Sequence, residues 1–194
     1  ITINKIKIFK IYPNTFDKSL DKKGHGIWIH GMPFNGDREK FTQGCLALDN
    51  EKLETLAKNI DYKKTVLITS GDEFKKAKKE DIALILSSIY KWKDAWKTSN
   101  INEYLSFYSK DFKRADRSDF NTFANQKKQI FAKNENKIIN LYNMDISPYP
   151  NSLGKKIYRA VMDEEYYSPS VKFVGKKELF IEVANNKVQI LAED

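Results

Sequence analysis

Three side chains suited to nucleophilic or acid–base chemistry lie within one short stretch of the sequence: His25, His30 and Cys45. They are the only two histidines and the only cysteine among the 194 residues. A cysteine nucleophile needs a base that forms the thiolate and dipoles that stabilise an oxyanion. Residue types and spacing leave two readings open, a catalytic Cys45–His30 pair or a packed cysteine beside a histidine in a turn. So few ligands provide no classical zinc site, and we expect no metal and no cofactor.

The segments around His30 and Cys45 carry more information than the two residues alone. Residues 26–31 read GIWIHG, and residues 41–48 read FTQGCLAL, followed by a helical pattern. Together they resemble the active-site signature of the L,D-transpeptidase (YkuD-type) catalytic domain. In that family an I-H-G strand end precedes a Ser/Thr-His-Gly-Cys-hydrophobic-Arg turn. The signature covers only about residues 24–56.

Two positions depart from this signature, because Gln43 replaces the usual His and Ala47 replaces the usual Arg. The residues that match are Thr42, Gly44 and Cys45. These departures, with the HGMP sequence that begins at His30, resemble a narrower branch. Its members are L,D-carboxypeptidases that trim peptidoglycan stem peptides in helical and curved bacteria. The resemblance implies removal of the terminal D-Ala from tetrapeptide muropeptides, which gives tripeptides and affects cell shape.

The same resemblance implies a role for each matching residue. Cys45 is the expected nucleophile, which attacks the carbonyl at the L-centre of the third stem residue. His30 is the expected base, and the Gly31 carbonyl takes the third place of a triad by orienting the imidazole. Gly44 permits a tight turn, so that its amide and that of Cys45 form an oxyanion hole.

Further side chains are candidates for substrate contact. They are Thr42, Gln43, Trp28, His25, Arg114, Arg117 and Tyr166. Structural readings remain open for most of them: Trp28 and Tyr166 as packed aromatics, His25 as a residue of a surface turn, and the two arginines as surface charge.

Other functions remain open beside trimming. Transpeptidation forms peptidoglycan cross-links or attaches proteins. It proceeds by the same chemistry as trimming as far as the acyl-enzyme, which then reacts with an amine in place of water. The chain could also bind muropeptides without catalysis. A separate enzyme site in the second half would need an acid or a histidine inside that domain, and both histidines lie outside it. Nucleic-acid binding would require a clustered basic stripe. The net charge is +8, but lysines alternate with acidic residues, so we expect no nucleic-acid partner.

The elements that must position His30 and Cys45 are mostly strands. Alternation of apolar and polar residues predicts strands over 1–11, 26–30 and 41–48, and another over 65–68. Asp49 and Asn50 offer a helix N-cap. We therefore expect a mostly-β catalytic domain over residues 1–70. The family has several strands before the His30 strand and only one precedes it here, so we expect the domain to lack its N-terminal strands.

A charged linker is predicted over residues 71–80, followed by a second domain over residues 81–194. Helical periodicity predicts helices over 81–97, around 104–112 and over 119–132. Strands are predicted over 137–146, 156–167, 171–183 and 187–193. Helices followed by antiparallel strands indicate an α+β domain with helices on one face of a curved sheet. Members of the branch are similar in having an NTF2-like domain at this place.

Location and partners follow from the proposed substrate. Peptidoglycan as the partner implies work in the periplasm, although no signal peptide is visible. No apolar run reaches the 18 residues of a membrane span, so no span is expected. The oligomeric state stays unknown.

Overall fold

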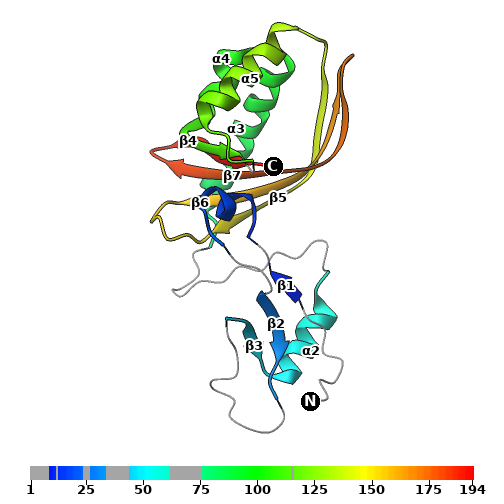
Figure 1. The fold of residues 1–194 in the computed structure, drawn as a ribbon, viewed down its shortest axis with the longest axis vertical. Helices are drawn as coiled ribbons and strands as arrows, with labels where there is room; N and C mark the ends of the chain where they lie inside the picture. The colour runs from blue at the N-terminus through cyan, green and yellow to red at the C-terminus, as the bar shows by residue number, and fades with distance from the viewer. Residues whose placement is uncertain (1–8, 12, 24–26, 34–43, 62–75, 115) are drawn as a thin grey trace. The chain divides into compact units, whose positions relative to one another are not determined.

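The computed structural model describes residues 9–11, 13–23, 27–33, 44–61, 76–114 and 116–194. Contacts divide the chain into two compact units (Figure 1). The first comprises residues 1–14 and 21–67, and the second comprises residues 15–20 and 68–194. The expected organisation into two domains is confirmed.

The first unit contains a three-stranded sheet and one helix. Its elements are β1 (Phe9–Ile11), β2 (Ile27–Gly31), β3 (Leu46–Leu48) and α2 (Asn50–Asn59). The strand order is β1-β2-β3, with β1 antiparallel and β3 parallel to β2. Ile29 on β2 and Leu53 on α2 are buried. The strand predicted over 65–68 lies outside the described residues.

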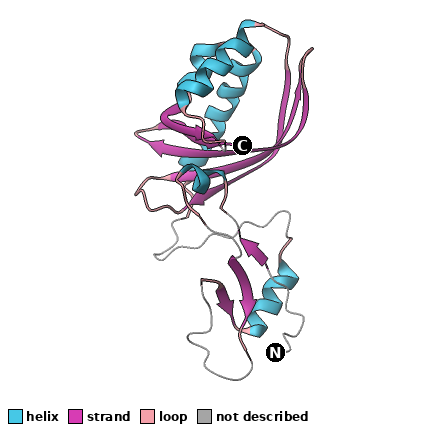
Figure 2. Cartoon of the chain, viewed as in Figure 1, coloured by secondary structure: helices cyan, strands magenta, loops and turns pink. Residues whose placement is uncertain are grey.

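The second unit places three helices against a curved five-stranded sheet (Figure 2). The helices are α3 (Lys79–Lys97), α4 (Ile101–Ser106) and α5 (Phe120–Ala132). The strands are β4 (Tyr108–Arg114), β5 (Ile138–Tyr149), β6 (Ile157–Tyr167), β7 (Lys172–Ala184) and β8 (Lys187–Glu193). Their order in the sheet is β4-β8-β7-β6-β5. This arrangement confirms the predicted α+β cone, although the sheet is mixed because β4 and β8 are parallel.

The main core lies between the helices and the inner face of this sheet. From α3, Ile85, Ile89 and Trp92 are buried at helical spacing. From β6, Ala160 and Met162 alternate with outward-facing residues and are fully buried. The helix period and the strand period thus direct both sets of apolar side chains into one layer.

The sequence does not predict the short helix α1 (Thr15–Ser19), which covers part of the outer face of the same sheet. Phe16 is 3% exposed and stacks on Phe180 of β7, with ring centroids 5.3 Å apart. The Tyr149 ring meets Phe16 edge-on at 5.7 Å. The next residue on β7, Ile181, belongs to the main core, so Phe180 faces the opposite side. A segment early in the chain therefore completes a second, smaller core.

One predicted helix is wrong in part. Tyr108 and Phe112 were expected on the helix that holds Tyr104, but they lie on β4. Tyr108 pairs with Ile190 of β8. A spacing of four residues fits one turn of helix and also one face of a strand, and pairing with β8 decides between them.

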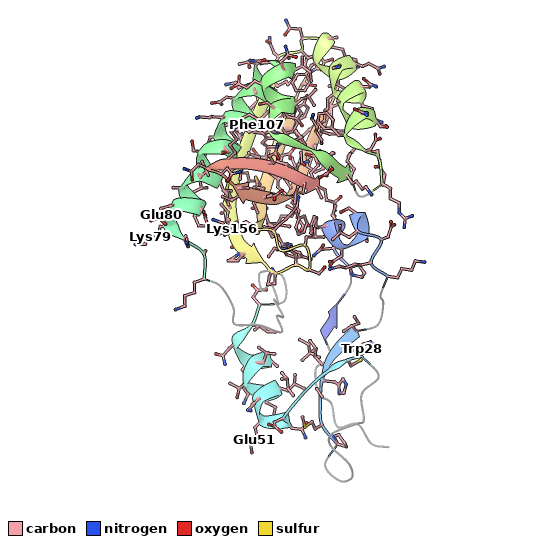
Figure 3. All side chains as sticks on the ribbon, turned by 90° about the vertical axis from the view of Figure 1, so that its left-hand side faces the viewer. Trp28, Glu51, Lys79, Glu80, Phe107 and Lys156 are labelled. Atoms are coloured by element: carbon pink, nitrogen blue, oxygen red, sulfur yellow. The ribbon has the colours of Figure 1, made fainter. Side chains whose placement is uncertain are left out.

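The beginning of α3 is attached to the sheet by one buried carboxylate. Asp81 is 7% exposed and accepts hydrogen bonds from the Tyr158 hydroxyl at 2.7 Å and from Lys156 Nζ at 3.0 Å. Figure 3 labels Lys156 of this group and Glu80, the residue before Asp81. The contact fixes the position of α3 relative to β6.

Candidate functional site

The register of β2 and β3 relates His30, on β2, to Cys45, which directly precedes β3. Residue His30 is level with Ala47, and Ile29 is level with Leu46. Cys45 directly precedes β3, so the same register places it level with Trp28. Side chains of a strand alternate between faces, so an extended chain at Cys45 directs its side chain to the face of the sheet that carries His30.

His30 is held by its own neighbour in the chain. Its Nδ1 atom lies 2.8 Å from the carbonyl oxygen of Gly31. A carbonyl only accepts hydrogen bonds, so Nδ1 carries the proton in this contact and Nε2 of the neutral ring is left as the basic nitrogen. Both His30 and Cys45 are half-buried.

Gly44 shapes the turn that leads into Cys45. Its φ of +99° belongs to a region that residues with a side chain rarely adopt. A Cβ atom added to Gly44 would meet no heavy atom of the described residues within 4 Å. The requirement for glycine is therefore one of backbone conformation and not of space.

The beginning of α2 contacts the segment that follows β2. Asn50, the first residue of α2, donates a hydrogen bond from Nδ2 to the Met32 carbonyl at 3.1 Å. Asp49 occupies the predicted N-cap position, but its side chain makes no cap hydrogen bond and instead lies 3.5 Å from Lys52. Asn50 thus links the helix after Cys45 to the backbone after His30.

The remaining predicted contact residues are divided between the two units. His25, Thr42 and Gln43 lie outside the described residues. Trp28 is half-buried on β2 (Figure 3). Tyr166 is 8% exposed and stacks on Trp96 in the core of the second unit, with centroids 5.2 Å apart.

The two arginines lie at one turn after β4, in which the Arg117 amide donates to the Arg114 carbonyl at 2.9 Å. Arg114 ends β4 level with Glu193 of β8, and its charge acts on that carboxylate. Arg117 is exposed, in a turn with φ of +69°.

A network of polar side chains lies inside the second unit, centred on Tyr108. Its hydroxyl donates to Glu193 Oε2 at 2.8 Å and accepts from Trp92 Nε1 at 3.0 Å. The Tyr104 hydroxyl lies 2.8 Å away, and since Tyr108 has a single proton, Tyr104 donates to it. Burial, together with the charge of Glu193, raises the pKa of Tyr108 well above its usual range. The network therefore stays protonated at its tyrosines.

Charged side chains surround this network. Lys177 Nζ lies 3.4 Å from Glu193 Oε2. Burial opposes ionisation of Glu193, but Lys177 and Lys127 prevail and hold its pKa below the usual value. Burial raises the pKa of Glu164 and lowers that of Lys127. Lys127 Nζ lies over three aromatic rings, at 5.3 to 5.6 Å from the centroids of Trp96, Tyr104 and Phe123. An ammonium in this position can bind a carboxylate.

Glu164, Glu193, Lys127 and Lys177 are not among the candidate residues that the sequence suggested. One signal was available, since Glu164 interrupts the inward series Ala160, Met162 and Tyr166 on β6. A charged residue in an otherwise apolar series marks a buried polar site.

Among the described residues, no group of three or more His, Cys, Asp and Glu side chains could hold a metal ion. None of the helices described is long and apolar enough to cross a membrane.

Comparison with known proteins identifies both units. The L,D-transpeptidase catalytic domain matches residues 3–68, and the Cds6 C-terminal NTF2-like domain matches residues 84–194. No curated protein sequence matches the chain closely enough to count as a relative.

Solved structures match almost the entire chain. The helical cell shape determining protein Pgp2 from Campylobacter jejuni is 43% identical, with a TM-score of 0.87 over 96% of this chain and 67% of that one. A single-residue variant of Pgp2 gives 42% identity and a TM-score of 0.89, over 96% of this chain and 66% of that one. Bd1075 from Bdellovibrio bacteriovorus shares the fold at 24% identity, with a TM-score of 0.75 over 96% of this chain and 67% of that one.

The chain thus spans about two thirds of the length of these relatives. The two domain matches, their order along the chain and the identity to Pgp2 agree with one another. The chain therefore belongs to the L,D-transpeptidase (YkuD) family, in the group whose catalytic domain is followed by an NTF2-like domain.

Proposed function

We propose that the protein is a peptidoglycan L,D-carboxypeptidase that removes the terminal D-Ala from tetrapeptide muropeptides. The observations that support the proposal are the register of β2 with β3, which Cys45 directly precedes, and the contact of His30 with the Gly31 carbonyl. Membership of the L,D-transpeptidase family and similarity to a cell-shape determining protein support the substrate class.

The proposed reaction has two steps. His30 Nε2 takes the thiol proton of Cys45, and the thiolate attacks the carbonyl carbon of the third stem residue. The oxyanion is stabilised by the amides of Gly44 and Cys45, where one such donor is worth about 3 kcal/mol. Collapse breaks the peptide bond, and His30 returns the proton to the D-Ala amine that leaves. Water, deprotonated by His30, then hydrolyses the thioester and regenerates Cys45.

The test is release of D-Ala from a purified tetrapeptide muropeptide by the complete protein. Cys45→Ala is expected to abolish release, and His30→Gln to reduce it by at least a hundredfold. Asn59→Ala, at an exposed position of α2, is the matched control and retains full activity. Wild-type turnover by Cys45→Ala would refute the assignment. Products cross-linked through an amine acceptor, in place of tripeptides, would favour transpeptidation.

We also propose that the second unit binds the muropeptide and does no chemistry. The cluster of Lys127, Lys177 and Arg114 around Glu193 supports this, because a stem peptide presents free carboxylates. Binding there would position the substrate for the first unit and so lower the entropic part of the barrier.

The test is an NMR titration of the whole chain with a tetrapeptide muropeptide. The whole chain is required because α1 forms part of the second unit. We expect amide shifts around Lys127 and Lys177, and Lys127→Ala removes them while Lys187→Ala, at an exposed position of β8, does not. Absence of shifts at millimolar ligand would leave the unit a structural or docking module.

A further inference from the structure

Asn50 occupies an unusual position relative to the Cys45–His30 pair. It lies five residues after Cys45 at the start of α2, and its Nδ2 atom donates to the Met32 carbonyl, two residues after His30. Figure 3 labels the neighbouring Glu51 at this end of the helix. A single side chain thus connects the segment that carries the nucleophile to the segment that carries the base.

The hydrogen bond from Asn50 to the Met32 carbonyl restricts the direction in which the Gly31 carbonyl points. That carbonyl belongs to the peptide group between Gly31 and Met32, and it accepts the hydrogen bond from His30. Pro33 limits the preceding Met32 to extended conformations. With the Met32 backbone restricted by Pro33 and its carbonyl held by Asn50, the Gly31 peptide group has little freedom to rotate.

The amide oxygen of Asn50 indicates that this position requires the Nδ2 hydrogen-bond donor. Asn50 Oδ1 is buried and has no hydrogen-bond partner among the described residues. A flipped amide would place Oδ1 against the Met32 oxygen, so the orientation with Nδ2 toward Met32 is the favourable one. A buried carbonyl oxygen without a partner destabilises the fold, and an apolar side chain of similar shape would avoid that cost. An asparagine here is therefore explained by the hydrogen bond that it donates.

We propose that Asn50 is a positioning residue for the reaction: it holds the backbone after His30 so that the Gly31 carbonyl orients the imidazole toward Cys45. Asn50 acts through Met32 and Gly31 and does not touch the substrate. The inference rests on the proposed function of Cys45 and His30.

The experiment measures the rate at which iodoacetamide alkylates Cys45, the only thiol, as a function of pH in the complete protein. Asn50→Leu removes the donor and retains the approximate shape, and Asn50→Asp is isosteric and lacks the amide protons. Both are expected to lower the alkylation rate at pH 7 roughly tenfold and to shift the pH midpoint upward by about one unit, because a misdirected imidazole stabilises the thiolate less. Asn59→Leu is the control, since the Asn59 amide donates to the Thr55 carbonyl on the same helix.

A purely structural role would change the melting temperature and leave the alkylation profile of the folded protein unchanged. A profile of Asn50→Asp that coincides with the wild-type profile therefore overturns the proposal, and this variant decides the matter if Asn50→Leu does not fold. The proposed function fails separately, if Cys45→Ala still releases D-Ala from the muropeptide.

Discussion

Gly44 illustrates how a single residue can serve the site through its backbone alone. Its φ of +99° turns the chain into Cys45, and no atom of the described residues lies within 4 Å of the place where a Cβ would be. A substitution there tests conformation without adding a steric clash. The second unit offers a matched position, because Gly154 has φ of +67° and equally open space.

We predict that Gly44→Ala and Gly154→Ala each destabilise their unit by about 1–2 kcal/mol, since both force alanine to a positive φ. Only Gly44→Ala should reduce release of D-Ala, because relaxation of its backbone moves the amides proposed to bind the oxyanion. Denaturant unfolding and turnover are measured on the same samples. Equal activity of the two variants would argue against an oxyanion hole at Gly44.

At the scale of elements, the attachment of α3 to β6 depends on pH. Burial first, and then the hydrogen bond to Asp81, raise the pKa of Tyr158 to about 12. In the unfolded chain the phenol titrates near 10. The folded state therefore favours the protonated phenol, and its contribution is complete below pH 10 and is lost as the pH rises toward 12.

We predict that Tyr158→Phe is less stable than the wild type by about 2 kcal/mol at pH 8 and that this difference disappears near pH 12. Thermal unfolding across that range measures it. Tyr90→Phe, at an exposed position of α3, serves as the control and should follow the wild type throughout. A difference that persists at pH 12 would mean that the Tyr158 ring packing, not the Asp81 hydrogen bond, is what the variant disturbs.

The helix α1 gives a second prediction at this scale. Phe16→Ala removes the ring that packs against Phe180 and Tyr149 and should destabilise the second unit by about 3–5 kcal/mol. Lys18→Ala, on the exposed side of the same helix, should change little. Hydrogen exchange at amides of β7 and β8 reports the loss. Unchanged protection there would show that α1 does not contribute to this core.

Predictability from sequence follows the strength of each pattern. The helices α3 and α5 and the four strands β5 to β8 show long runs of one period, and their boundaries fall within a few residues of those expected. In contrast, α1 has five residues and one fully packed aromatic, Phe16, which is too short a run for any period to be recognised.

Only part of the candidate functional residues could be predicted from the sequence. The segments around His30 and Cys45 are recognisable because they carry a local signature. The charged interior of the second unit depends on contacts between β4, α5, β7 and β8, such as that of Lys177 with Glu193, which no local spacing reveals.

For the whole molecule, the proposed substrate determines where the protein works. Peptidoglycan lies outside the cytoplasm, so we predict recovery of the protein in the periplasmic fraction after osmotic shock of the native cells. A cytoplasmic enzyme assayed in each fraction controls for lysis, and immunoblotting detects the protein. Recovery together with the cytoplasmic enzyme alone would argue against a role in the cell wall.

The position of α1 has a consequence for the order in which the chain folds as it is synthesised. Phe16 leaves the ribosome long before its contacts Phe180 and Leu191, which lie far along the sequence. Domains generally fold as units during synthesis, but this small core cannot close until β8 has been made. The Phe16 ring must therefore wait in contact with solvent or with a chaperone. Synthesis of β8, and not completion of the first unit, is then the event that closes this core on the outer face of the sheet.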